Sequence, residues 1–387
     1  MTRARGRHRA SRDAAPPPRS AASRRALRAA LLRWYRRERR DLPWRRTRDA
    51  YAIWVSEVML QQTRVETVIP YYERFLARFP RVEALAGARE SDVLAAWSGL
   101  GYYRRARHLK RAAEAVVREH GGRLPGDPEA LRALPGIGAY TAAAIASIGF
   151  GRPAAAVDGN VIRVIARLEG FRGRRDSGAL RRRVEAVAAA LAEGPAPGDW
   201  TQALMELGAT RCLPREPLCA RCPLSRRCRA RASGRPDGFP EAAPALPVRA
   251  ERRLLLAVRR GGRHLLVPDA AEQGAAWTLP AAVLRGGATE GVGEAGATAA
   301  ARSLARSLGL GGDPDGPVAR FRHRTFSHDL SFEVWRLADA EPADPATPAG
   351  GRWARAADLE RLPVRAPTLK ALRQLRGRGH ARKRVEM

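Results

Sequence analysis

The sequence predicts a mainly α-helical N-terminal domain followed by a smaller α+β domain. Apolar residues recur at helical spacing up to about residue 210, and a glycine-containing turn joins two of these helices. Strand-like apolar runs begin only after residue 250, with one helical segment among them, which is typical of α+β architecture. The stretch 232–250 is rich in Pro, Gly and Ala and predicts a linker. We therefore expect a helical domain at 26–231 and a second domain at 251–372.

The charge of the chain indicates polyanionic partners. The formal net charge is +32 over 387 residues, and nearly all the cations are arginine; the only lysines are Lys110, Lys370 and Lys383. No apolar run approaches the roughly 18 residues of a membrane span. The four cysteines are clustered, which suits a reducing compartment better than a disulfide framework. We expect a cytoplasmic, nucleoid-associated protein without a membrane partner.

Two terminal segments lack the pattern of a packed domain. Residues 1–25 are rich in arginine and contain Asp13 as their only acid, which predicts a disordered basic arm. An organellar transit peptide has a similar composition, and this alternative stays open. Residues 373–387 form a basic C-terminal tail.

A carboxylate lies inside an apolar run near the start of the helical domain. A helix predicted at 25–39 ends at Arg40–Arg45, and two further helices should meet near Gln62. Within the first of these two, Glu57 is surrounded by isoleucine, tryptophan, valine, methionine and leucine. Burial raises the pKa of a carboxyl group and keeps it protonated, so Glu57 is a candidate general acid. The alternative is a structural ion pair with an arginine.

The segment 97–105 combines two glycines, two tyrosines and two arginines. Such a loop could touch DNA and fill the gap left by a displaced base. The alternative is a turn whose tyrosines pack on the core.

The stretch 134–160 contains the turn Leu134-Pro135-Gly136-Ile137-Gly138 between two helical segments. Glycine permits a tight turn, and the free N–H groups of the second helix could bind a phosphate. This is a helix–hairpin–helix pattern, although an ordinary turn between helices would look alike. Asp158 then precedes a helical run and should be its N-cap, where the helix dipole favours the charged carboxylate. That position suits either a plain cap or a group that stabilises a sugar cation.

A short loop near the end of the helical domain could hold a metal centre. Its ligands would be four cysteines separated by six, two and five residues: Cys212, Cys219, Cys222 and Cys228. Iron–sulfur clusters and zinc both accept four thiolates, so the spacing leaves the metal open. Two disulfides are the remaining alternative.

The motifs SEVMLQQT, GLGYY, LPGIGAYTA and VDGN, followed by the cysteine run, resemble those of the adenine DNA glycosylases in the same order. This family removes adenine mispaired with 8-oxoguanine and belongs to the helix–hairpin–helix superfamily that also contains endonuclease III. The resemblance is dense from residue 26 to residue 229 and looser beyond. It implies a [4Fe-4S] cluster on the four cysteines, a monomeric enzyme, and duplex DNA with an A:8-oxoG or A:G mispair as partner.

One position distinguishes two activities within this superfamily. The endonuclease III-like relatives carry a lysine where this chain has Tyr140, and that amine forms a Schiff base. A phenol cannot do so. The resemblance therefore implies a monofunctional hydrolase, with two rivals: a bifunctional glycosylase/lyase and a non-catalytic iron–sulfur protein that binds DNA.

The resemblance also assigns roles to single residues. Glu57 would protonate adenine, Asp158 would stabilise the sugar cation, and Tyr140 and Asn160 would support them. Matches to positions that contact the flipped adenine are Arg40, Trp44 and Gln202. Matches to positions around the mispair are Gln62, Leu100 and Tyr102, while Gly136 and Gly138 belong to the hairpin that grips DNA.

The second domain resembles the Nudix hydrolases in fold. Phe326-Ser327-His328 matches the loop that reads 8-oxoguanine in the family, so Ser327 and His328 are the expected contacts. The metal-binding motif of the Nudix hydrolases is missing, since residues 290–310 carry only Glu290 and Glu294 as acids. This domain should therefore bind without hydrolysing. Asp329 departs from the family, which usually has an apolar residue there.

Overall fold

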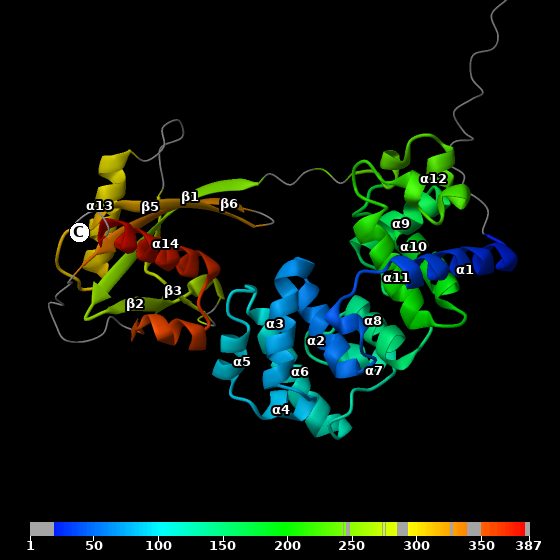
Figure 1. The fold of residues 1–387 in the computed structure, drawn as a ribbon, viewed down its shortest axis with the longest axis horizontal. Helices are drawn as coiled ribbons and strands as arrows, with labels where there is room; N and C mark the ends of the chain where they lie inside the picture. Colours follow the sequence, from blue (N-terminus) through cyan, green and yellow to red (C-terminus); the bar gives the residue numbers. More distant parts are fainter. Residues whose placement is uncertain are drawn as a thin grey trace, which may run out of the picture. The chain divides into compact units, whose positions relative to one another are not determined.

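The structure is a computed structural model that describes residues 19–242, 244, 248–272, 274, 276–284, 293–325, 328–338 and 350–383. The chain forms two compact units (Figure 1). Unit 1 comprises Met1–Gln62 and Ala115–Pro244, and unit 2 comprises Thr63–Glu114 and Ala245–Met387. The sequence predicted a single division at the linker 232–250. The structure instead groups the segment 63–114 with the C-terminal sheet.

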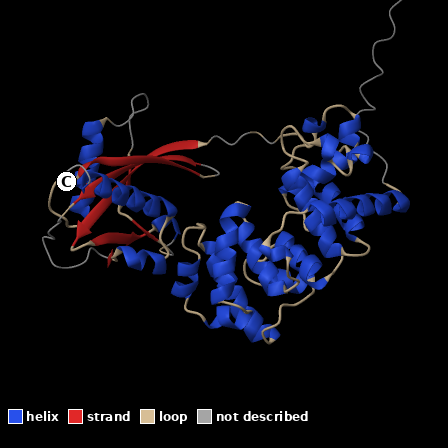
Figure 2. Ribbon diagram, in the orientation of Figure 1, coloured by secondary structure: helices blue, strands red, loops and turns tan. Residues whose placement is uncertain are grey.

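Unit 1 is helical (Figure 2). Its α-helices are α1 (Ala21–Glu38), α2 (Ala50–Leu60), α7 (Pro128–Ala133), α8 (Ala139–Phe150), α9 (Gly159–Glu169), α10 (Gly178–Ala192), α11 (Pro197–Thr210) and α12 (Arg229–Ala232). Short 3-10 turns are η1 (Pro43–Arg45), η2 (Cys219–Arg221), η3 (Ser225–Arg227) and η4 (Pro236–Gly238). One apolar core is shared by α1, α9, α10 and α11. A second, smaller cluster joins α2 to α8.

The first helix begins earlier than the sequence predicted. α1 starts at Ala21, so residues 21–25 of the expected disordered arm are helical. Ser20 caps this helix by accepting a hydrogen bond from the Ser23 amide. Arg19 is held as well, because its Nε donates to Glu169 at 2.5 Å. The arginine-rich composition concealed both contacts. The rest of the predicted arm, residues 1–18, lies outside the described residues.

Unit 2 combines helices with a seven-stranded sheet. Its first elements are α3 (Val65–Arg78), α4 (Val82–Gly87), α5 (Glu90–Ala96) and the start of α6 (Arg104–His120). The strands are β1 (Arg249–Arg260), β2 (Arg263–Pro268), β3 (Trp277–Thr278), β4 (Ala281–Val283), β5 (Asp315–Arg324), β6 (His328–Leu337) and β7 (Arg352–Ala354). They are accompanied by η5 (Ala270–Glu272), α13 (Glu294–Ser307), η6 (Ala356–Arg361) and α14 (Ala366–Lys383).

The sheet is buried on both faces. Its main path is β3-β2-β1-β6-β5, in which β1 and β6 are parallel and the other pairs are antiparallel. Successive residues of β1 alternate between two apolar clusters, because side chains on a strand point to opposite faces. One cluster contains Leu255 and residues of α14, and the other contains Leu254, Leu256 and residues of α13. The two helices therefore cover opposite faces of the sheet.

The strands expected at 254–258, 264–267 and 330–337 are present. The strand expected at 320–326 is present up to Arg324, and Phe326 lies outside the described residues. The helix expected at 297–310 is α13, which ends earlier, at Ser307. The structure of the predicted basic tail was not expected from the sequence, because most of this segment is helical. α14 runs from Ala366 to Lys383 and so occupies most of the segment 373–387. Ala371 and Leu372 are buried against the sheet, and this packing holds the helix despite its basic composition.

The segment 63–114 belongs to unit 2 because its loop bonds to the C-terminal region. Val364 donates through its backbone amide to Ser98 Oγ at 3.0 Å. The Tyr103 hydroxyl donates to the Val364 carbonyl oxygen at 2.9 Å. Tyr103 and Trp97 are fully buried. Across the described residues, no helix is long and apolar enough to span a bilayer.

Candidate active site

Glu57 lies in the middle of α2 and is only 6 % exposed. Its pKa is raised from 4.5 to about 7, chiefly by burial; the interaction with Tyr140 lowers it in part, and the charge of Asp158 adds to the rise. Among the described residues Glu57 makes no ion pair, so the structural pairing with an arginine is not observed. The carboxyl group is thus poised to carry a proton near neutral pH.

Tyr140 lies in the first turn of α8, which packs against α2. Its hydroxyl donates a hydrogen bond to the Met205 sulfur at 3.8 Å and also interacts with the Glu57 carboxyl group. Burial, and then the nearby carboxylates of Glu57 and Asp158, raise the pKa of Tyr140 well above its usual value. The side chain therefore remains a neutral phenol, and its interaction with Glu57 lowers the pKa of that carboxyl group.

Asp158 is the N-cap of α9, as the sequence predicted. Its Oδ1 accepts from the Val161 amide at 2.7 Å, and its Oδ2 accepts from Asn160 Nδ2 at 2.9 Å. The carboxylate is held at the positive end of the helix dipole. Because its charge raises the pKa of both Glu57 and Tyr140, it lies near the same pair. The structure therefore brings together Glu57, Tyr140, Asp158 and Asn160.

The position of Asn160 depends on a glycine in α11. A Cβ placed on Gly208 would lie 2.6 Å from the Asn160 Cβ, so only glycine lets the two helices approach this closely. On its other side, Asn160 accepts through Oδ1 from Arg163 at 2.9 Å. Arg163 is buried and also donates to the Gly208 and Cys212 carbonyl oxygens, each at 2.8 Å.

Two arginines are anchored on one buried carboxylate of α11. Glu206 accepts from Arg40 Nη2 and Arg45 Nη2, each at 2.8 Å, and its carboxylate is fully buried. Burial raises the pKa of Glu206, but the hydrogen bonds from Arg40 and Arg45 outweigh it and lower the pKa to about 2. The charge of Arg45 also lowers the pKa of Glu57. This ion-pair cluster thus lies near the Glu57 carboxyl group.

The other two residues matched to adenine contacts are nearly buried. Trp44 is part of η1, which directly follows the Arg40 segment, and Gln202 lies one helical turn before Glu206 on α11. Gln202 is 7 % exposed, and no described residue is hydrogen-bonded to its amide. An amide in that condition can donate to and accept from a bound base.

The hairpin between α7 and α8 has the predicted form. Gly136 has a φ of 76° in the left-handed region, and Gly138 is the N-cap of α8. No side chain caps this helix, so its first N–H groups remain available. Leu134 and Ile137 are buried while the two glycines are exposed. The exposed edge of the turn is therefore backbone, which suits contact with a phosphate.

The four cysteines are close to one another but do not form a ready metal site. All four are free thiols, so the disulfide alternative is wrong. Burial, together with the charges of the other three cysteines, raises the pKa of Cys222 to about 12. Arg167 Nη1 approaches the Cys212 sulfur at 3.5 Å. Within the described part of the chain, no three Cys, His, Asp or Glu side chains are arranged as metal ligands. Four thiols on one short loop nonetheless fit a cluster or a zinc ion by donor chemistry.

The residues expected around the mispair belong to different units of the chain. Gln62 ends unit 1, is exposed and has a φ of 59°, an uncommon conformation for a non-glycine residue. In unit 2, Tyr102 is 41 % exposed with a φ of 51°, whereas Leu100 is buried. Of the two tyrosines in this loop, only Tyr103 packs in the core. Gln62 and Tyr102, whose ring contacts the Arg105 guanidinium, are therefore the exposed side chains of this set.

Ser327 lies outside the described residues, and His328 begins β6. The His328 amide donates to Thr325 Oγ1 at 3.0 Å, which closes the turn from β5 to β6. Asp329, the departure from the family, pairs with Arg324 across the two strands at 3.3 Å. Its charge is thus partly compensated within the sheet.

Sequence reasoning missed Arg45, Glu206, Gly208 and Arg163. One signal was available for Glu206, because Gln202 and Glu206 are four residues apart and share a helix face. Another was the pair Arg163 and Arg167, two cations inside the apolar run of α9. Nothing in the sequence marks Gly208.

Comparisons with known proteins place this chain in a family. Residues 55–189 match the HhH-GPD superfamily of base excision DNA repair proteins. The chain is 46 % identical over 240 residues to the human adenine DNA glycosylase, covering 57 % of this chain and 44 % of the human protein. It is 37 % identical over 389 residues to the mouse adenine DNA glycosylase, covering 85 % of this chain and 73 % of the mouse protein.

A solved structure of a thermostable thymine-DNA glycosylase is similar with a TM-score of 0.50 and 32 % identity, covering 55 % of this chain and 98 % of that one. This similarity shows the helical glycosylase fold, beyond which the chain continues into the region that contains the sheet. The chain spans somewhat less than half of the human relative and nearly three quarters of the mouse relative. On these matches, the chain belongs to the adenine DNA glycosylase family of HhH-GPD base excision repair proteins.

Proposed function

We propose that the protein hydrolyses the N-glycosidic bond of adenine mispaired with 8-oxoguanine or guanine in duplex DNA. The observation that carries this proposal is the pairing of a buried Glu57, whose pKa is about 7, with Asp158 held as a helix N-cap. One carboxyl group that keeps its proton and one that is held in a charge-stabilising position are the two parts needed to break a glycosidic bond. The family membership supports adenine as the base.

In the proposed reaction, Glu57 donates its proton to N7 of adenine. The bond between C1′ and N9 breaks, and its electron pair moves to N9. Asp158 opposes the positive charge that develops on the sugar. Water then adds to C1′, and its proton passes to the Glu57 carboxylate, which restores the acid.

The exposed backbone of Gly136 and Gly138 would grip the DNA, and Gln202 with the Arg40–Glu206 pair would border the flipped adenine. The chain has a formal net charge of +32, so the negatively charged backbone of duplex DNA is a suitable partner for it.

The test compares Glu57→Gln with the unchanged protein on duplexes containing A:8-oxoG, A:G, A:C and A:T. Alkali cleaves the abasic sites, and gel shift measures binding. We expect adenine release from A:8-oxoG and A:G, lost in Glu57→Gln with mispair binding retained. If Glu57→Gln loses binding in parallel with activity, Glu57 does not act as the proton donor. If adenine is released from A:T at the same rate as from the mispairs, the enzyme is not specific for mispaired adenine.

Recognition of 8-oxoguanine is proposed for the β5–β6 turn. 8-Oxoguanine has a donor at N7 and an extra oxygen at C8, and a hydroxyl and an imidazole can distinguish both from guanine, at about 1–3 kcal/mol per good contact. The matched test replaces Ser327 and His328 together by alanine. Affinity for A:8-oxoG should fall much more than affinity for A:G, whereas equal losses would reduce the turn to a backbone contact.

A second candidate, the bifunctional lyase, needs a nucleophilic amine. Lys110 is 8 % exposed and donates to Glu114 at 2.6 Å and to the Ala86 carbonyl oxygen at 3.1 Å, so it is occupied. Borohydride should therefore trap no covalent DNA adduct. A trapped adduct would favour the lyase.

A further inference from the structure

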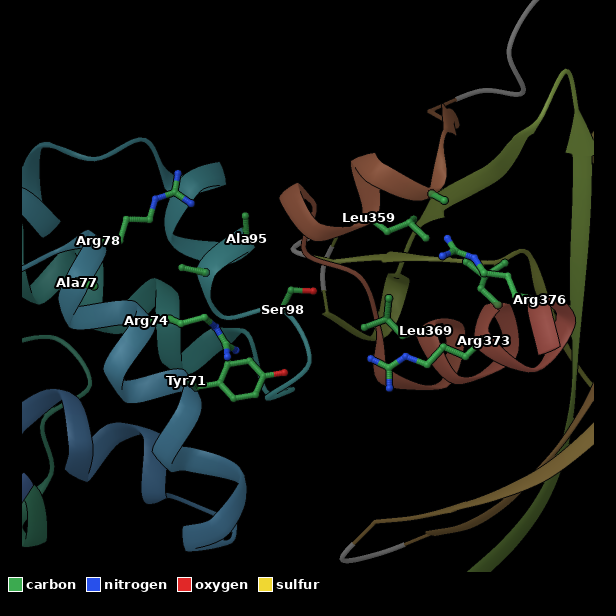
Figure 3. A pocket seen from close by; sticks show the side chains of 13 residues that line it. Tyr71, Arg74, Ala77, Arg78, Ala95, Ser98, Leu359, Leu369, Arg373 and Arg376 are labelled. Atoms are coloured by element: carbon green, nitrogen blue, oxygen red, sulfur yellow. The ribbon is translucent and has the colours of Figure 1, made fainter. Parts of the chain in front are cut away.

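Unit 2 contains a cleft of about 820 Å³ that the proposed reaction does not use (Figure 3). One wall comes from α3 and α5 and carries Tyr71, Arg74 and Arg78. The opposite wall comes from η6 and α14 and carries Arg373 and Arg376. Ser98 lies between the walls and is bonded to Val364, so the cleft has a fixed width at that end. Its volume falls in the usual range for sites that bury a ligand, about 300–1,000 Å³.

The rim of the cleft is cationic. Its four arginines are all exposed. Arg78 pairs with Asp92 at 2.9 Å, and Arg74 stacks on the Tyr71 ring at 4.6 Å. No carboxylate among the described residues pairs with Arg74, Arg373 or Arg376. Within the described side chains, three positive charges around this concave site therefore lack a counter-charge.

Part of the cleft lining is apolar. It is lined by small and aliphatic side chains: Ala77, Ala95, Ala96, Leu359, Leu369 and Leu372. Alanine stops at Cβ, so the α3 and α5 wall leaves room where a longer side chain would fill it. Such a space accommodates a large apolar side chain of a ligand, and removing that side chain from water would supply much of the affinity.

We propose that this cleft binds an acidic peptide segment of a partner protein that carries one or two large apolar side chains. The apolar side chains enter between the alanines and leucines, and neighbouring Asp or Glu residues pair with Arg74, Arg373 and Arg376. Arginine suits this role because its guanidinium binds carboxylates through two parallel hydrogen bonds.

A DNA backbone fits the cleft less well. Phosphates need donors along the whole contact, and the interior offers aliphatic carbon instead. A duplex lying on the rim would leave the interior unfilled. An acidic peptide with apolar side chains can pair with the arginines of the rim and also fill the space between the aliphatic side chains.

The test begins with a phage-displayed library of random peptides selected on the full-length protein. We expect the enriched peptides to combine Asp or Glu with Phe, Leu, Ile or Trp. Fluorescein-labelled copies are then titrated with protein by anisotropy. Arg373→Glu with Arg376→Glu should lower the affinity roughly tenfold or more, which corresponds to about 1.4 kcal/mol. Ala77→Trp, which fills the cleft without changing charge, should lower it similarly.

The matched control is Arg259→Glu with Arg260→Glu, an equal charge change on exposed residues of β1 in the same unit. It should leave peptide affinity unchanged, and Ala77→Trp should leave affinity for undamaged duplex unchanged. Failure to enrich acidic–apolar peptides would overturn the proposal, as would binding that ignores both cleft variants. If duplex DNA displaces the peptide and both cleft variants weaken DNA in parallel, the cleft is a phosphate track instead. Thermal melting followed by circular dichroism identifies a variant that has lost its fold.

Discussion

The hydroxyl of Tyr140 interacts with the carboxyl group of Glu57, and this interaction offsets part of the effect of burial on the Glu57 pKa. Burial raises the Glu57 pKa, and the phenol lowers it by stabilising the carboxylate. The result is a pKa of about 7, at which the acid still carries its proton and can release it. The position at which the resemblance separates a hydrolase from a lyase therefore also adjusts the pKa of Glu57.

The first prediction concerns Tyr140→Phe. Without the phenol, the Glu57 pKa should rise above about 7, because the interaction that lowers it is gone. Since the protonated form is the active acid, the alkaline limb of the single-turnover rate should move to higher pH. The maximal rate should fall, because Glu57 is then held less firmly. Met205→Leu is the control, since it keeps the phenol and changes only the sulfur at 3.8 Å; its pH profile should not move. A limb that shifts to lower pH in Tyr140→Phe would contradict this account.

The second prediction concerns Gly208→Ala. The new methyl group would meet the Asn160 Cβ at 2.6 Å, so Asn160 and the Asp158 carboxylate that it holds must move. A displacement of about 1 Å can cost roughly a hundredfold in rate. We expect single-turnover excision to fall by up to that factor with DNA affinity little changed. Gly178→Ala, where the nearest atom is at 3.5 Å, should leave the rate unaltered. Full activity in Gly208→Ala would show that Asn160 needs no fixed position.

The third prediction concerns Glu206→Gln. The folded-state pKa of Glu206 is lowered from 4.5 to about 2, so its ion pairs contribute stability above the unfolded value and lose it as the pH falls toward about 2. At neutral pH the substitution should therefore lower the free energy of unfolding by roughly 3 kcal/mol. Urea unfolding measures this. Asp176→Asn removes a carboxylate paired on the surface of the same unit and should leave the urea midpoint unchanged. Equal effects of the two substitutions would mean that the Glu206 cluster is no stronger than a surface pair.

The fourth prediction concerns the cysteine loop. We propose that Cys212, Cys219, Cys222 and Cys228 hold a [4Fe-4S] cluster whose role is to shape the loop and its arginines. Anaerobically purified protein should be brown and contain about four irons per chain. Removing the metal should make the segment 211–229 sensitive to protease, while α1 and α10 keep their protection. Stoichiometric zinc without iron would overturn the cluster assignment.

Local signals in the sequence were enough for part of the site. Glu57 stands out because an acid in an apolar run is unusual, and Asp158 because a cap precedes a periodic segment. Glu206 escaped because its partners, Arg40 and Arg45, are about 160 residues away in the chain and no local pattern joins them. Gly208 escaped because its role is purely steric, and a close approach between two helices has no signature in one sequence.

The same distinction between local and long-range signals applies to the fold. The strands of the sheet were predicted from their apolar runs, since strand burial is local in pattern. The helix at Ala366–Lys383 was not, because its stability comes from packing on the sheet and its composition resembles a solvated tail. The grouping of residues 63–114 with that sheet depends on the bonds to Val364 and is equally invisible in the sequence.

Because of these hydrogen bonds to Val364, the linker is not a boundary between two structurally independent parts of the chain. Tyr103 and Ser98 lie 261 and 266 residues before their shared partner. A premature stop codon, or a protease cut in the linker followed by loss of the C-terminal fragment, would therefore release a loop encoded far upstream. A mutation that removes the C-terminal region would therefore also loosen the loop that carries Tyr102, because the neighbouring Tyr103 loses its hydrogen bond to Val364.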